Sequence, residues 1–132
     1  IFTTHNYISV TDEVPMLRKG AIDASDGRKV AIPFNMRDGI AICIGKGNAQ
    51  WHNTAPHGAG RIMSRAQAKK QISMCEYENA MAGIYSSSVC TGTLDESPMA
   101  YKPTEDILEL IRPTVEVIAM IKPKLNIKDN GE

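Results

Sequence analysis

Apolar and β-branched residues occur in short runs over the first fifty positions of the chain. These runs are residues 1–10, 17–22, 29–34 and 40–44. The segments between them carry turn residues, for example S-D-G-R at 25–28 and R-D-G at 37–39. The pattern predicts short strands joined by tight turns, with 40–44 as the most deeply buried of them.

The second half has a helical pattern. Residues 62–72 are rich in Ala and Lys, and Ser73 with Glu76 has the spacing of a capping box that opens a second helix through about Met81. Thr104 is expected to cap a longer helix with an apolar stripe, which Pro113 should kink or split. The stripe comprises Ile107, Leu108, Ile111, Val115, Ile118 and Met120 or Ile121. The remaining expectations are an irregular segment at 85–103, a short strand at 124–128 and a frayed end at 129–132.

These elements predict an α+β fold, with short strands first and helices later, in one domain over residues 1–132. The composition is 42% hydrophobic and 23% charged, which excludes disordered and fibrous classes. No apolar run approaches the ~20 residues of a membrane span, so no membrane partner is expected. Three cysteines without a C-x-x-C pair favour a reducing, cytoplasmic compartment.

The formal net charge of zero conceals a difference between the two halves. Residues 1–72 contain ten Lys/Arg and five Asp/Glu, whereas residues 73–132 contain five Lys/Arg and ten Asp/Glu. A basic first half can attract phosphates. Asymmetry of this size also arises by chance, so it adds little without a specific site.

The segment 48–61 has neither helical nor strand periodicity, and it ends in H-G-A-G-R at 57–61. Glycines allow the backbone to approach a ligand closely, and the start of the following helix offers free N–H groups to a phosphate. Arg61 and Arg65 lie four residues apart and can face the same anion. His57 could then act as a nucleophile, a general base or a metal ligand. An ordinary glycine turn with a nearby His and two Arg is an equally open interpretation.

A metal site built by this sequence alone is not expected. A catalytic site takes about three protein ligands, and the three His and three Cys are scattered along the chain. His5 could be one ligand, although a single His on a strand is more often only hydrogen-bonded. Any metal site should therefore include ligands from outside these residues.

Several short motifs occur together in a fixed order. They are H-N-Y at 5–7, R-K-G-A at 18–21, I-P at 32–33, H-G-A-G-R at 57–61, M-S-R at 63–65, D-E-x-P at 95–98, A-Y-K at 100–102 and I-K at 127–128. In this order they resemble the C-terminal part of the RNA-splicing ligase RtcB family. The resemblance covers essentially the whole chain, and each motif is weak without the others.

The resemblance implies a ligase that joins RNA 3′-phosphate or 2′,3′-cyclic phosphate ends to 5′-hydroxyl ends, using GTP and Mn²⁺. His57 would be the catalytic nucleophile that carries GMP, and His5 would ligate manganese. Nucleotide-binding residues would be Asn35, Ala59, Gly60, Tyr101 and Lys128. RNA or phosphate would be bound by Lys19, Arg61 and Arg65. The expected partners are GTP and RNA ends, either tRNA halves or broken RNA.

The sequence departs from the family pattern in two respects. The family has an upstream half with further metal ligands, so the chain is expected to be a C-terminal fragment of a larger catalytic domain, inactive alone. Residues 32–37 read I-P-F-N-M-R, where the family usually has I-P-G-S-M-G. Asn35 could replace the hydrogen bonds of the family serine. A non-catalytic nucleotide- or RNA-binding paralogue is the alternative, and a purely structural domain is a third possibility.

Overall fold

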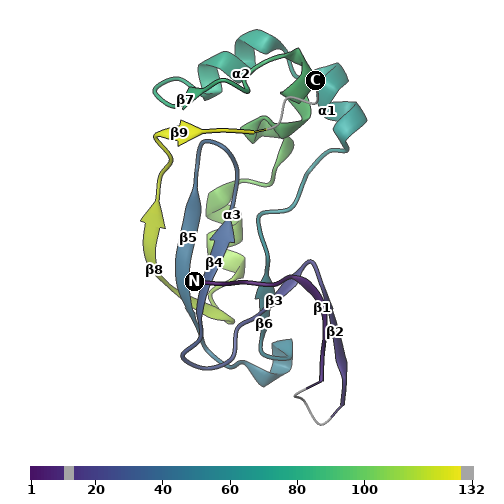
Figure 1. Cartoon of the computed structure of the whole chain (residues 1–132), viewed down its shortest axis with the longest axis vertical. Helices are drawn as coiled ribbons and strands as arrows, with labels where there is room; N and C mark the ends of the chain where they lie inside the picture. The colour runs from purple at the N-terminus through teal and green to yellow at the C-terminus, as the bar shows by residue number, and fades with distance from the viewer. Residues whose placement is uncertain (11–13, 129–132) are drawn as a thin grey trace.

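A three-stranded antiparallel sheet forms the centre of the molecule in the computed structural model, which describes residues 1–10 and 14–128. Its strands are β4 (Lys29–Pro33), β5 (Ile40–Gly45) and β8 (Val115–Ile121), in the order β4-β5-β8. Buried and exposed residues alternate along β4 and β5, so one face of each strand enters the core. Helix α3 (Thr104–Leu110) lies beside the sheet in Figure 1 and contributes Ile107 to the same core.

The long helix predicted to follow Thr104 is wrong, because residues 115–121 form the strand β8. Helix α3 ends at Leu110, and the carbonyl oxygen of Ile111 accepts hydrogen bonds from the N–H groups of Thr114 and Val115. Pro113 has no N–H to donate to a helical hydrogen bond, and residues 115–121 are largely β-branched. They therefore pair with β5 as a strand instead of continuing the helix. Ile111 and Val115 of the predicted stripe nevertheless remain buried in the core.

Thr104 does not cap α3. Pro103 occupies the N-cap position, and the Thr104 hydroxyl donates instead to Oδ2 of Asp38 at 2.8 Å. This contact ties the start of α3 to the turn between β4 and β5.

Gly20 divides the predicted strand 17–22 into two. With φ at +65° it turns the chain between β2 (Met16–Lys19) and β3 (Ala21–Asp23). Strand β2 pairs with β1 (Asn6–Ser9), while β3 pairs with β6 (Thr54–Pro56), which lies in the segment predicted to lack periodicity. The positive φ of Gly20 therefore sends two consecutive strands into two different sheets.

The helical end of the molecule has its own small core. Helices α1 (Arg65–Gln71) and α2 (Met74–Ala80) each begin with a capping box, so the box predicted at Ser73 is confirmed. The segment predicted to be irregular contains β7 (Tyr85–Ser86) and the 3₁₀ helices η2 (Thr91–Glu96) and η3 (Pro98–Ala100). Another 3₁₀ helix, η1 (Ala49–Trp51), precedes β6. The predicted strand 124–128 shortens to β9 (Leu125–Asn126), which pairs in parallel with β7.

The mixed α+β class, with strands first and helices later, is confirmed. Helices α1 and α2 lie at one end of the molecule and the β1–β2 hairpin at the other (Figure 1). None of the described helices is both long and apolar enough to cross a membrane. The predicted fraying of 129–132 concerns residues outside the described part of the chain.

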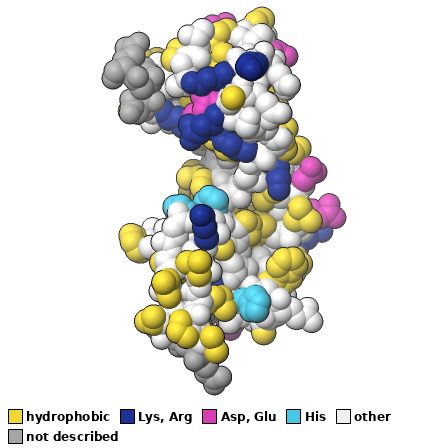
Figure 2. Space-filling view, turned by 90° about the vertical axis from the view of Figure 1, so that its right-hand side faces the viewer, with side chains coloured by type: hydrophobic (Ala, Val, Ile, Leu, Met, Phe, Trp, Pro, Cys, Tyr) yellow, Lys and Arg dark blue, Asp and Glu magenta, His cyan; other side chains and the backbone are white. Residues whose placement is uncertain are grey.

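The β1–β2 hairpin carries exposed apolar side chains. Ile8 and Leu17 lie opposite each other, and both are more than half exposed, as are Val10 and Val14 nearby. Figure 2 shows yellow side chains gathered at this end of the molecule. A two-stranded hairpin is only marginally stable in water, so this surface is suited to being covered by further polypeptide.

Candidate functional site

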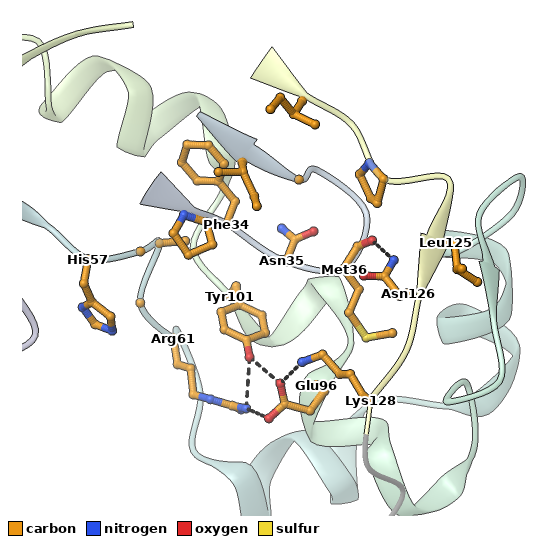
Figure 3. A pocket seen from close by; sticks show the side chains of 18 residues that line it. Phe34, Asn35, Met36, His57, Arg61, Glu96, Tyr101, Leu125, Asn126 and Lys128 are labelled. Carbon is orange, nitrogen blue, oxygen red and sulfur yellow. Dashed lines mark hydrogen bonds and ion pairs between the residues drawn. The ribbon is translucent and has the colours of Figure 1, made fainter. Parts of the chain in front are cut away.

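A cavity of about 760 Å³ lies between the central sheet and the helical end. Segments far apart in the sequence line it, from the end of β4 to the region after β8 (Figure 3). Most of the residues expected to form the site meet here, namely Asn35, His57, Ala59, Gly60, Arg61, Tyr101 and Lys128. The volume lies within the range of small-molecule sites, roughly 300–1,000 Å³.

The 57–60 loop packs tightly against the end of β4. The N–H of Ala59 donates to the carbonyl oxygen of Pro33 at 3.2 Å. A Cβ atom at Gly58 would lie 2.9 Å from the same oxygen, which is too close for any other residue. The absence of a side chain at Gly58 therefore allows the loop to pack against the end of β4 at the cavity wall, and close approach to a ligand stays a prediction.

His57 is oriented by a backbone contact and a ring contact. Its Nδ1 lies 2.8 Å from the carbonyl oxygen of Gly20, and its ring stacks on that of His5 with centroids 4.8 Å apart. A carbonyl oxygen only accepts hydrogen bonds, so Nδ1 carries the proton and Nε2 keeps its lone pair in the neutral ring. The turn at Gly20 thus selects the tautomer of His57.

Arg61 and Tyr101 face each other across a short backbone bridge. Gly60 accepts a hydrogen bond from the N–H of Lys102, and Ala100 accepts one from Ile62. The Arg61 guanidinium lies 4.9 Å from the centre of the Tyr101 ring. Both side chains therefore enter the cavity from paired backbone segments rather than from free loops.

Glu96, which our sequence reasoning left without a role, lies at the centre of a polar cluster (Figure 3). Its Oε1 accepts from Arg61 at 2.9 Å, and its Oε2 accepts from Tyr101 at 2.8 Å and from Lys128 at 2.7 Å. The D-E-x-P motif at 95–98 was the available signal for it. Asn126, also missed, donates to the carbonyl oxygen of Met36 at 2.7 Å and belongs to a segment without a distinctive pattern.

The cluster shifts the pKa values of Glu96 and Tyr101. Burial would raise the pKa of Glu96, but hydrogen bonds from Lys128 and Tyr101 and the charge of Arg61 outweigh it, so the pKa lies below its ordinary value. Burial and the Glu96 carboxylate together raise the pKa of Tyr101. At neutral pH the carboxylate is therefore charged and the phenol is protonated.

Asn35 lines the cavity, but its amide belongs to a local turn. Its Oδ1 accepts from the N–H groups of Arg37 and Asp38, and its Nδ2 donates to Asp38 at 2.8 Å. Phe34 is only 3% exposed and packs in the core of the sheet, although it also borders the cavity. The bulky segment therefore folds on itself, and a nucleotide contact by Asn35 stays a prediction.

Lys19 and Arg65 do not line the cavity. Lys19 lies exposed at the end of β2, in the β1–β2 hairpin. Arg65 forms ion pairs with Asp95 at 3.0 Å and Glu96 at 3.4 Å, and its side chain stays 72% exposed. Lys69 lies 3.6 Å from the same Asp95 and is half exposed, so Arg65 and Lys69 together form an exposed basic surface around this carboxylate.

The described residues do not build a complete metal site. Within 1–10 and 14–128, no three His, Cys, Asp or Glu side chains gather in a way that could hold an ion. His5 is the single predicted ligand, and it lies against His57. The donor set fits an anionic ligand better, because Arg61 Nη1 is buried and has no hydrogen-bond partner among the described residues.

Comparisons with known proteins show which family the chain belongs to. The family model "tRNA-splicing ligase RtcB" matches residues 1–129. The RNA-splicing ligase RtcB of Escherichia coli K12 is 34% identical over 128 residues, which cover 94% of this chain and 31% of the relative. The tRNA-splicing ligase RtcB of Aeropyrum pernix is 38% identical over 101 residues, covering 73% and 20% respectively. The matched part thus spans 31% and 20% of the lengths of these two relatives, and the chain belongs to the RtcB family of tRNA-splicing ligases.

Proposed function

We propose that this chain is the nucleotide-binding part of an RNA ligase, and that His57 carries GMP during the reaction. The observation that supports this most is the contact between His57 Nδ1 and the carbonyl oxygen of Gly20, at 2.8 Å. It leaves Nε2 as a nucleophile at the edge of a cavity large enough for a nucleotide. The whole ligase would join RNA 3′-phosphate or 2′,3′-cyclic phosphate ends to 5′-hydroxyl ends.

In the first step, Nε2 of His57 attacks the α-phosphorus of GTP. A P–N bond forms, the bond from that phosphorus to the bridging oxygen breaks, and pyrophosphate leaves. The Gly20 carbonyl holds the Nδ1 proton and favours the positive charge that the ring acquires. GMP then passes to the RNA 3′-phosphate, and attack by the 5′-hydroxyl joins the ends and releases GMP.

The donor groups of the cavity suit a guanine nucleotide. Guanine presents O6 and N7 as acceptors, and Lys128 can donate to them while Tyr101 offers an aromatic face. The buried Nη1 of Arg61 remains available for a phosphate oxygen. Arg65 and Lys69 on the exposed basic surface, with Lys19 further along, would bind the phosphates of the RNA ends.

Manganese would require a shared site. Mn²⁺ would supply Lewis-acid activation and charge neutralisation at phosphorus. His5 would give one ligand, and the others would come from the polypeptide that longer relatives have beyond the matched third. The same polypeptide would cover the apolar β1–β2 hairpin.

A second candidate is a non-catalytic nucleotide- or RNA-binding paralogue. The segment 34–37 favours it, because Phe34 and Arg37 replace family glycines and the Asn35 amide is engaged in its own turn. Such a protein would keep the cavity and lose histidine labelling.

Covalent labelling distinguishes the two candidates. The longest natural chain that contains this sequence is incubated with α-labelled GTP and Mn²⁺, beside His57→Asn and the matched control His52→Asn. We expect acid-labile, alkali-stable label in the wild type and in His52→Asn, and none in His57→Asn. No label in any protein, together with a thermal shift on adding GMP, would favour the binding paralogue. The absence of both would leave a structural domain.

A further inference from the structure

Glu96 joins side chains from three separate parts of the chain. Arg61 follows the 57–60 loop, Tyr101 follows η3, and Lys128 comes after β9, yet all three donate to one carboxylate. The Glu96 side chain is only 19% exposed. Charge-assisted hydrogen bonds at this depth are stronger and more directional than those on the surface.

The carboxylate restricts the side chains that surround the cavity. A free Lys side chain samples many rotamers, and fixing it in one of them costs conformational entropy. In this structure the Lys128 Nζ is already held 2.7 Å from Glu96, and the Tyr101 hydroxyl is held 2.8 Å from the same oxygen. A ligand that uses these groups would not have to order them on binding.

Glu96 itself is poorly placed to bind a ligand. Oε1 accepts from Arg61 and lies 3.4 Å from Nη1 of Arg65, while Oε2 accepts from Tyr101 and Lys128. Both oxygens are therefore engaged by protein donors before any nucleotide arrives.

We propose that Glu96 is a positioning residue, which aligns Arg61, Tyr101 and Lys128 for the base and phosphates of the nucleotide. This inference rests on the proposed function of the cavity as a GTP site. It assigns Glu96 an effect on nucleotide affinity and no part in the transfer of GMP to His57.

The test measures the initial rate of His57 labelling against GTP concentration, in the longest natural chain with Mn²⁺. For Glu96→Gln we expect the KM for GTP to rise about tenfold or more, since charge-assisted hydrogen bonds are lost. The rate at saturating GTP should stay within about threefold of wild type, because Nε2 is untouched. The matched control Glu78→Gln, exposed on α2, should change neither value.

Two further variants separate alignment from folding. Glu96→Asp keeps the negative charge but withdraws the oxygens by one bond, so its KM should also rise. Lys128→Met should raise the KM for GTP by itself. The double variant with Lys128→Met and Glu96→Gln should raise it by a smaller factor than the product of the factors for the two single variants. Circular dichroism melts confirm that each variant is folded at the assay temperature.

The outcomes are distinguishable. A labelled wild type with unchanged KM in folded Glu96→Gln and Glu96→Asp would overturn the positioning role alone. Fully independent effects of Glu96 and Lys128 would also overturn it. A wild type that neither takes label nor binds GMP would refute the proposed function, and the positioning role with it.

Discussion

The imidazole rings of His5 and His57 lie nearly parallel, with 4.8 Å between their centroids and 5° between their planes. His5 precedes β1, whereas His57 follows β6, and the backbone of Gly20 contacts both. The turn between two strands thus brings the predicted metal ligand and the predicted nucleophile together. This relationship allows the metal and stacking roles of His5 to be separated by mutation.

His5→Phe keeps an aromatic ring beside His57 but removes the ligand nitrogen. We expect a change in unfolding free energy of less than about 1 kcal/mol, because the aromatic contact survives. Labelling of His57 should fall by at least tenfold if His5 ligates manganese. Urea denaturation and labelling at increasing Mn²⁺ measure the two effects. Normal labelling of the variant at low Mn²⁺ would exclude His5 as a ligand.

Gly58→Ala should destabilise the protein and weaken nucleotide binding. The new Cβ would lie 2.9 Å from the Pro33 carbonyl oxygen, and a backbone atom can move only with its strand. We expect a loss of about 1–3 kcal/mol in unfolding free energy. Gly45→Ala is the control, because its Cβ would lie 2.3 Å from the Ser25 carbonyl oxygen, away from the cavity. Calorimetry with GMP should show weaker binding only for Gly58→Ala, and equal affinities would contradict this.

Asp38 should contribute to stability in a defined pH range. Hydrogen bonds from Arg37, Asn35 and Thr104 outweigh burial and lower its pKa from 3.8 to about 2. Its contribution is therefore complete above about pH 4, and is lost as the pH falls toward 2. Asp38→Asn should flatten the fall in unfolding free energy over this range, whereas exposed Asp26→Asn should not. Urea denaturation at several pH values tests this, and parallel curves for wild type and Asp38→Asn would contradict it.

Phe34→Ala should destabilise the fold although Phe34 borders the cavity. Phe34 belongs to the same buried core as Ile32 and Ile107, so removing its ring would leave a large void. We expect a cost of about 3–5 kcal/mol in unfolding free energy. Chemical denaturation measures it against Tyr85→Ala, an exposed aromatic residue on β7. Equal stabilities of the two variants would show that Phe34 is not part of the core.

In the proposed nucleotide site, Tyr101 would make two contributions that mutation can separate. Tyr101→Phe keeps the ring beside Arg61 and removes the hydrogen bond to Glu96, so GMP affinity should fall only a few-fold. Tyr101→Ala removes the ring as well, and affinity should fall roughly tenfold further. Titration calorimetry with GMP compares them. Equal affinities would mean that the ring does not stack on the base.

The sequence predicted local features better than pairings between distant segments. The strands predicted at 29–34 and 40–44 and the capping box at Ser73 depend on neighbouring residues, and they are present. The strand β8 was predicted as a helix, because its apolar spacing suits either element until β5 offers an open edge. The turn at Gly20 was missed for the same reason. Its positive φ is needed because β2 and β3 pair in two different sheets, and no local pattern shows those pairings.

The site residues show the same difference between local patterns and contacts from distant segments. The H-G-A-G-R motif at 57–61 is recognisable from five neighbouring residues, so His57 and Arg61 could be predicted as site residues from the sequence. Glu96 could not, because its importance arises from donors 35, 5 and 32 residues away in the chain. A carboxylate in a short polar segment is common, and only the folded structure shows which side chains donate hydrogen bonds to it.

The cavity is assembled from segments that run from Pro33 to Lys128, so it exists only when nearly the whole chain has folded. Contacts between such distant segments form late and slow the folding of a chain. In the proposed site a nucleotide would therefore bind only molecules in which these segments have folded, and it would shift the folding equilibrium without accelerating the early steps. Nucleotide added during refolding should slow unfolding rather than speed folding, and occupancy of the cavity would report how many molecules had reached the native state.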